Sequence, residues 1–179
     1  MRHGTVWYVL ALSLSLILLS PTSAAQTGLL DVGLRSSVDA SNEKEKFEQY
    51  ELFASHELPW SWQLPADWCV STKLDATAGA LRGAGETGLV ASIGPSLVLS
   101  SPGGRVSLEG GSSPTVLSRD KFGRQDFGVK FQFTSHASLR VKLSSNVGVG
   151  YRYQHMSNAG MSSHNPGLDL HMLELSFHF

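Results

Sequence analysis

The amino-acid sequence predicts an all-β fold, an eight-stranded antiparallel transmembrane β-barrel of the outer membrane. Three observations predict it. Apolar and polar residues alternate along most of the chain, and no segment after the N-terminal region keeps a helical period. Charged residues occupy one face of several predicted strands, which suits a polar barrel interior but not the packed core of a soluble sandwich. The last predicted strand ends on Phe177 and Phe179, as strands of outer-membrane barrels often do.

The N-terminal segment is expected to lie outside the barrel. Met1-Arg-His3 is positively charged, Val6 to Leu19 is almost entirely apolar, and Ser23 and Ala25 suit the −3 and −1 positions of a cleavage site. An apolar run of about 14 residues is short for a membrane-spanning helix, which disfavours a retained anchor. We therefore expect residues 1–25 to be a secretory signal peptide that is removed, and residues 26–179 to form the barrel.

Four strands are expected in the first half of the barrel: Gly28–Ser37, Phe47–Glu57, Trp68–Ala80 and Thr87–Ser101. The third strand alternates clearly, with Lys73 and Asp75 on the face opposite its apolar residues. The fourth keeps one apolar parity from Leu89 to Leu99. The second is the weakest of the four, because its glutamates blur the alternation.

Four further strands complete the count: Arg105–Leu117, Phe127–Leu143, Val147–Ser157 and Gly167–Phe179. The segment from Phe127 to Leu143 places its apolar residues on one parity and Lys130, Arg140 and Lys142 on the other. The pattern of Arg105–Leu117 is blurred by two adjacent glycines. Eight is an even number and the smallest common number of strands in a closed barrel.

The connections fit this topology. Ser101–Gly104 and Ser144–Asn146 read as tight turns, whereas 39–46 and 118–126 read as longer, charged loops. If both termini are periplasmic, the longer loops fall mostly on the exterior side. The 58–65 link is longer than a typical periplasmic turn. Aromatic residues could form the interfacial girdles: Trp60, Trp62, Trp68, Tyr151 and Tyr153.

Composition excludes several other classes of protein. The chain carries 14 Lys and Arg against 15 Asp and Glu and has no basic stripe, so we expect no nucleic-acid partner. Cys69 is the only cysteine and can form no internal disulfide. Histidines and acids show no metal-ligand spacing, so no metal is expected. A soluble lipocalin-like barrel stays as an alternative fold, but it would turn its apolar face inward.

Three side chains near the end of the chain suit a nucleophile, a base and an orienting acid. Alternate residues from Val147 to Tyr153 face lipid in the predicted strand, and His155 and Ser157 continue that parity. Asp169 shares the parity of the apolar residues that follow it, and a hairpin turning near Ser162 would bring it level with His155. A serine hydroxyl attacks an ester only when a base removes its proton, and a carboxylate orients that base. The pattern therefore predicts a catalytic triad on the outside of the barrel.

An esterase also needs hydrogen-bond donors for the oxyanion that develops on the substrate. Asn158, Asn165 and the backbone N–H of Gly160 are the candidates. Gly160 and Gly167 allow the sharp backbone that such a pocket requires.

The segment His155-Met-Ser-Asn-Ala-Gly160, followed by Asn165-Pro-Gly167 and an acid at 169, resembles the PagL family of lipid A 3-O-deacylases. The resemblance implies that Ser157 is the nucleophile, His155 the base and Asp169 the acid, and that no cofactor is needed. It also implies hydrolysis of the ester-linked 3-hydroxyacyl chain at the 3 position of lipid A, within lipopolysaccharide of the outer leaflet. Well-known members carry glutamate at the acid position, so the shorter Asp169 could orient His155 more loosely.

Two other functions stay open. The barrel could be a non-catalytic structural protein, or an outer-membrane esterase that acts on another lipid. The sequence also leaves open whether the barrel forms a homodimer. Cationic residues of the exterior loops either meet lipid A phosphates or form a solvated rim: Lys44, Lys46, Arg119, Lys121 and Arg124.

Overall fold

The computed structural model describes residues 28–40 and 45–179. Its strands are β1 (Leu29–Asp39), β2 (Phe47–Gln63), β3 (Cys69–Gly83), β4 (Glu86–Ser100), β5 (Val106–Leu117), β6 (Lys121–Phe122), β7 (Gln125–Asp126), β8 (Phe131–Lys142), β9 (Val147–Ser157) and β10 (Leu168–His178). Short 3-10 turns, Pro65–Asp67 and Pro102–Gly104, follow β2 and β4. The predicted signal peptide lies outside the described residues.

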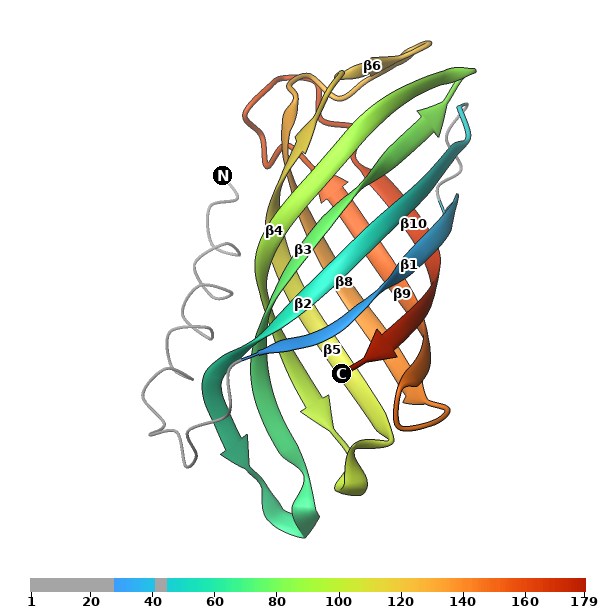
Figure 1. Cartoon of the computed structure of the whole chain (residues 1–179). Helices are drawn as coiled ribbons and strands as arrows, with labels where there is room; N and C mark the ends of the chain where they lie inside the picture. Colours follow the sequence, from blue (N-terminus) through green and yellow to red (C-terminus); the bar gives the residue numbers. More distant parts are fainter. Residues whose placement is uncertain (1–27, 41–44) are drawn as a thin grey trace.

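Eight long antiparallel strands of the described chain close into one barrel, in the order β1-β10-β9-β8-β5-β4-β3-β2 (Figure 1). The first and last strands close the barrel by pairing from Asp31↔His178 to Asp39↔Leu170. Closure leaves no edge strand exposed. The predicted fold class and strand number are confirmed. Within the described ranges, no helix is long and apolar enough to cross a membrane.

Two strand boundaries differ from the prediction by more than three residues. β2 does not stop at Glu57 but continues to Gln63, after a bulge between Glu57 and Ser61. Pro59 lies in this bulge, where the ladder is interrupted and a missing N–H is tolerated. The link predicted to be long is therefore mostly strand, and the turn that follows is short.

The other difference concerns the start of β8. The strand begins at Phe131 rather than Phe127, because Gly128 turns the backbone with φ +80° and donates its N–H to the Asp126 carboxylate. Part of the predicted loop 118–126 instead forms the small β6–β7 hairpin, which caps the upper end of the barrel in Figure 1. We call this end, which carries the 40–46, 84–85, 118–130 and 158–167 connections, the loop end.

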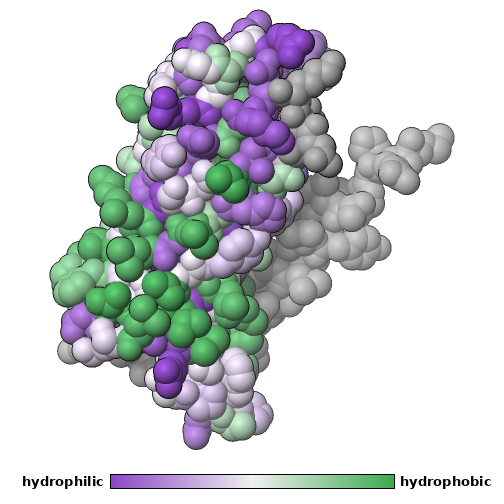
Figure 2. Space-filling model, turned by 90° about the vertical axis from the view of Figure 1, so that its right-hand side faces the viewer, coloured by the Kyte–Doolittle hydropathy of each residue, from purple (hydrophilic) through white to green (hydrophobic). Residues whose placement is uncertain are grey.

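The strands turn apolar residues outward and polar residues inward. Leu34, Leu52, Leu89, Leu173 and Leu175 are each more than half exposed on the outer wall. Figure 2 shows hydrophobic residues gathered over the middle and lower part of one face, with hydrophilic residues above them. This distribution is the inverse of a soluble barrel and suits an outer wall surrounded by lipid.

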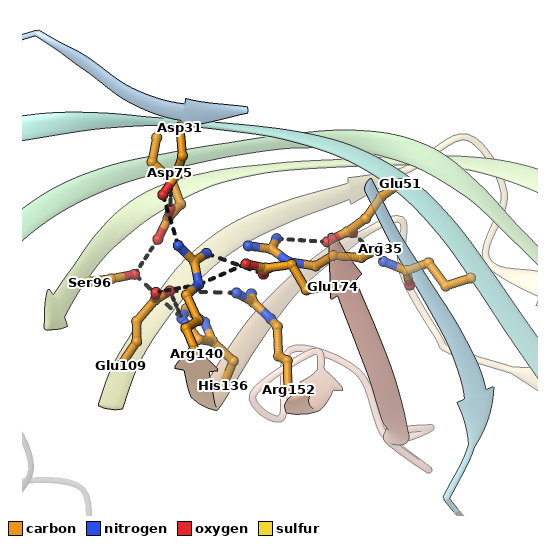
Figure 3. A network of polar contacts seen from close by, with 12 residues as sticks. Asp31, Arg35, Glu51, Asp75, Ser96, Glu109, His136, Arg140, Arg152 and Glu174 are labelled. Carbon is orange, nitrogen blue, oxygen red and sulfur yellow. Dashed lines mark hydrogen bonds and ion pairs between the residues drawn. The ribbon is translucent and has the colours of Figure 1, made fainter. Parts of the chain in front are cut away.

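The middle of the barrel is filled by a network of paired charges (Figure 3). Four buried cations, Arg35, Lys73, Arg140 and Arg152, face five buried carboxylates, Asp31, Glu51, Asp75, Glu109 and Glu174. Arg140 lies 2.9 Å from Asp31 and 2.8 Å from Glu174, while Arg35 bridges Glu174 at 2.7 Å and Glu51 at 2.9 Å. The opposite charges compensate one another, since a single unpaired charge inside the barrel would be costly.

Nearer the loop end, the interior contains a cluster of aromatic rings. Phe47, Phe122 and Phe127 form a cluster with ring centroids 5.6–6.0 Å apart. Phe127 was predicted to face lipid, but it is 1% exposed and belongs to this cluster. The inward side chains of Met156 and Leu168 join the same core. Close packing inside the barrel therefore holds the ends of β9 and β10 in place. The outward side chains at these strand ends include the predicted site, so the packing also fixes its position.

Candidate active site

His155 and Asp169 meet on the outer wall of the barrel. They pair directly across the β9–β10 ladder, as a hairpin turning near Ser162 would place them. His155 Nδ1 and Asp169 Oδ1 are 2.7 Å apart, and the two side chains are 48% and 35% exposed. An ionised carboxylate only accepts hydrogen bonds, so the imidazole donates its Nδ1–H and keeps the lone pair on Nε2. This tautomer is the one that can act as a base.

Ser157 is the last residue of β9 and shares the outward face of His155. Its partner across the ladder is Phe133 on β8. In the described part of the chain, its hydroxyl has no hydrogen-bond partner, so the serine and the histidine are neighbours on one face without a direct bond. Residues two apart on a strand are separated by roughly 6.5–7 Å. In sites without substrate, such catalytic hydrogen bonds are often long and shorten when substrate binds.

Asn158 is the residue that holds the loop after β9. Its side chain is 0% exposed, and its Nδ2 donates to the carbonyls of Phe127 at 2.9 Å and His164 at 2.7 Å. Its Oδ1 accepts the N–H of Gly160 at 2.9 Å. The amide is therefore fully engaged in bracing the loop. Sequence spacing could not reveal this role, because Phe127 lies 31 residues earlier in the chain.

Asn165 differs from Asn158 because its side-chain amide has an unused hydrogen-bond donor. Its Oδ1 accepts the backbone N–H of Asn158 at 2.9 Å, which fixes the orientation of the amide. Among the residues that the structure describes, its Nδ2 has no partner. Of the three oxyanion candidates, Gly160 and Asn158 use their N–H groups within the loop, and Asn165 presents a free one.

Gly167 lies directly against His155. Its φ is +74°, and a Cβ at this position would lie 3.1 Å from His155 Cε1. The backbone of the β9–β10 loop thus forms a wall along the imidazole. A residue with a side chain would be strained at this φ and would also push the ring.

Two other histidines, His171 and His136, have partners of their own away from His155. His171 pairs across the ladder with Tyr153, and its Nδ1 is hydrogen-bonded to the Tyr151 hydroxyl on the outer wall. This contact satisfies His171 at the lower edge of the site. His136 is buried in the barrel, where its Nε2 lies 3.0 Å from Glu109.

One group of potential metal ligands lies inside the barrel. Ligand atoms of Asp75, Glu109 and His136 lie within 4.8 Å of one another. Lys73 Nζ, however, is 3.1 Å from Asp75 and 2.7 Å from Glu109, so an ammonium already supplies the positive charge there. The group belongs to the charge network and not to the site on the outer wall.

Three of the exterior cations are paired with acids at the loop end, and two of these pairs join different connections. Arg119 lies 2.7 Å from Glu86, and Arg124 lies 3.2 Å from Glu45. Lys121 lies 3.0 Å from Asp126; its ammonium and then the Gly128 N–H lower the pKa of the Asp126 carboxyl. These contacts favour the interpretation as a rim that holds the loops together. Lys44 lies outside the described residues.

Comparisons with known proteins agree with this architecture. The model of the family described as lipid A 3-O-deacylase (PagL) matches residues 48–178. A crystal structure of the outer membrane enzyme PagL superposes with a TM-score of 0.69 at 24% identity, covering 82% of this chain and 97% of the other. The fold is thus that of a membrane β-barrel, with His155, Ser157 and Asp169 on its outer face.

The chain belongs to the lipid A 3-O-deacylase (PagL) family. It is also 39% identical over 77 residues to the lipid A deacylase PagL of Bordetella bronchiseptica (strain ATCC BAA-588 / NCTC 13252 / RB50). That alignment spans 43% of this chain and 43% of the relative, less than half of either.

Proposed function

We propose that this protein is a serine esterase of the outer membrane that hydrolyses the ester-linked 3-hydroxyacyl chain at the 3 position of lipid A. The observation that carries the proposal is the 2.7 Å His155–Asp169 pair on the outer wall, with Ser157 on the same face. Family membership and the printed name of the Bordetella relative support the substrate class.

The first half of the reaction forms an acyl-enzyme. Ser157 Oγ attacks the ester carbonyl while His155 Nε2 takes the hydroxyl proton. The Asp169 carboxylate stabilises the imidazolium that results and keeps the ring oriented. When the tetrahedral intermediate collapses, the bond between the carbonyl carbon and the 3-oxygen of the sugar breaks. His155 returns the proton to this departing oxygen.

Water completes the cycle. It attacks the acyl-enzyme while His155 again accepts a proton. The bond between the acyl carbon and Ser157 Oγ then breaks, His155 returns the proton to Ser157, and the free 3-hydroxy fatty acid leaves. In both halves, negative charge develops on the carbonyl oxygen. The free Nδ2 of Asn165 is the donor best suited to it, because the Asn158 N–H already orients this amide.

The outward position of the triad suits a lipid substrate. A lipid in the surrounding leaflet reaches the site by lateral diffusion, without entering the barrel, whose interior is filled by charged and apolar side chains. The site lies at the loop end, the end expected to face the exterior, where lipopolysaccharide forms the outer leaflet. The lipid-exposed polar groups would otherwise have no role on an apolar wall.

The test is a detergent-micelle assay of purified protein with lipopolysaccharide, in which released 3-hydroxy fatty acid is quantified. We expect release by the wild type and a loss of roughly 10⁴-fold or more for Ser157→Ala and His155→Ala. Ser145→Ala, at the opposite end of the barrel, is the control. Absence of release by the folded wild type would favour a structural barrel, and release from phospholipid instead would favour an esterase for another lipid.

A further inference from the structure

A row of four polar side chains crosses the outer wall at the level of the catalytic base. The ladders align Ser112 on β5 with Ser135 on β8, Ser135 with His155 on β9, and His155 with Asp169 on β10. The mechanism above uses only the last two. The two serines are exposed on the apolar wall and lie side by side.

The serine pair is incompletely satisfied. Ser112 Oγ and Ser135 Oγ are 3.1 Å apart and form one hydrogen bond with each other. Two hydroxyls carry two O–H donors, and the bond between them uses only one. Over the described residues neither hydroxyl has another partner. One donor and several acceptor lone pairs therefore face the surroundings of the barrel.

The residues beside this pair on the outer wall have small side chains. Immediately below it on the same two strands, Gly110 pairs with Ala137. A Cβ added at Gly110 would meet only one atom within 4 Å, the His136 carbonyl oxygen at 3.7 Å, so the space outside it is open. On β9, by contrast, the residue below His155 is the bulky Tyr153. An acyl chain that leaves the site over Gly110 and Ala137 passes smaller side chains than one that leaves over Tyr153.

We propose that Ser112 and Ser135 recognise the 3-hydroxyl group of the acyl chain that is removed. The inference rests on the proposed function. Ser135 lies diagonally from Ser157 across the β8–β9 ladder, a separation of about 7–8 Å. An acyl group bonded to Ser157 carries its 3-hydroxyl two carbons beyond the carbonyl, which brings it toward this pair. The free donor and lone pairs then complete their hydrogen bonds with the substrate.

Such a pair would select acyl chains by the presence of a 3-hydroxyl group and not by their length. A plain acyl chain would leave the serine hydroxyls unpaired when it covers them, whereas a 3-hydroxyacyl chain satisfies them. Sites that hydrogen-bond a substrate hydroxyl discriminate strongly against analogues that lack it. The pair would therefore direct the enzyme toward 3-hydroxyacyl esters and away from the plain acyl esters of phospholipids.

The experiment compares kcat/KM for two esters of one acceptor, 3-hydroxymyristoyl and myristoyl glucosamine, in micelles. We expect the wild type to prefer the hydroxylated ester by about 10-fold or more, roughly the worth of one hydrogen bond. Ser135→Ala and Ser112→Ala should reduce this ratio toward one, because kcat/KM falls for the hydroxylated ester and not for the plain one. Ser135→Thr keeps the hydroxyl and should keep the preference.

Ser36→Ala is the matched control, because Ser36 is an exposed outward serine on β1, away from this pair. It should retain the wild-type ratio. A ratio unchanged in both Ser135→Ala and Ser112→Ala, or a wild type that cleaves the two esters equally, would overturn the inference and leave the esterase intact. Cleavage of neither ester by folded wild type would overturn the proposed function and this inference with it.

Discussion

At the scale of single residues, Asp169 reaches His155 in spite of its length. Sequence comparison with the family suggested that an aspartate would orient the base more loosely than a glutamate. The 2.7 Å contact between Oδ1 and Nδ1 contradicts that concern, because it is already a short charge-assisted hydrogen bond. The ladder places Asp169 directly opposite His155, so no additional methylene is needed.

This geometry predicts different outcomes for two substitutions. Asp169→Asn keeps the size of the side chain but removes the charge that stabilises the imidazolium, and we expect kcat to fall by roughly 10²–10⁴-fold. Asp169→Glu keeps the charge and should retain activity within about 10-fold. Steady-state rates of fatty-acid release measure both. Equal activity of Asp169→Asn and wild type would remove Asp169 from the triad.

At the scale of elements, the β9–β10 loop shapes the space around His155. Gly167→Ala would add a Cβ 3.1 Å from His155 Cε1 at a φ of +74°. We expect activity to fall by about 10-fold or more through displacement of the ring, since small misplacements of catalytic groups are costly. Gly85→Ala is the control: its φ is +77°, so the backbone strain is the same, but a Cβ there meets nothing within 4 Å.

Both variants should lose similar stability, about 1–2 kcal/mol, in urea unfolding, and only Gly167→Ala should lose activity. If Gly85→Ala loses as much activity, the effect is general strain and not contact with His155.

The same loop depends on the buried Asn158 amide. Asn158→Ala removes the hydrogen bonds to the carbonyls of Phe127 and His164 and to the Gly160 N–H. Buried backbone groups left unpaired cost about 1–3 kcal/mol each, so the loop should open while the barrel stays closed. Limited proteolysis should then cut within 158–167 in the variant and not in the wild type. An uncut loop would contradict its role as a brace.

The elements also show what the sequence could predict. The facing of the side chains of β9 and β10 followed from parity, because one outward apolar residue in each strand determines the orientation of all the others. Their register followed from the expected hairpin turn near Ser162. The start of β8 did not, because Phe127 continues the apolar alternation of Phe131 and Phe133 but lies beyond the turn at Gly128. Alternation alone does not distinguish an outward phenylalanine from one folded into the barrel.

The role of each candidate donor depended on contacts distant in sequence. Asn158 and Asn165 look equivalent in the motif. Only the folded chain brings the Phe127 carbonyl to Asn158, and this contact engages one amide and leaves the other free.

At the scale of the whole molecule, the interior charge network ties together strands that are far apart in the barrel order. Arg140→Met removes the cation shared by Asp31 and Glu174 and leaves both carboxylates buried. We expect the free energy of unfolding in micelles to fall by about 3–5 kcal/mol. Arg82→Met, an exposed outward arginine of β3, should change it by no more than about 0.5 kcal/mol. Equal small effects would show that the network contributes little to stability.

We propose that a barrel stabilised from within presents a serine esterase to lipid A on its outer wall. The most direct test is mass spectrometry of lipid A from Gram-negative cells that express the wild type or Ser157→Ala at equal levels in the outer membrane. We predict that lipid A loses one 3-hydroxyacyl group in cells with the wild type and keeps it in cells with Ser157→Ala. Identical, fully acylated lipid A in both, or the same loss in both, would contradict the claim.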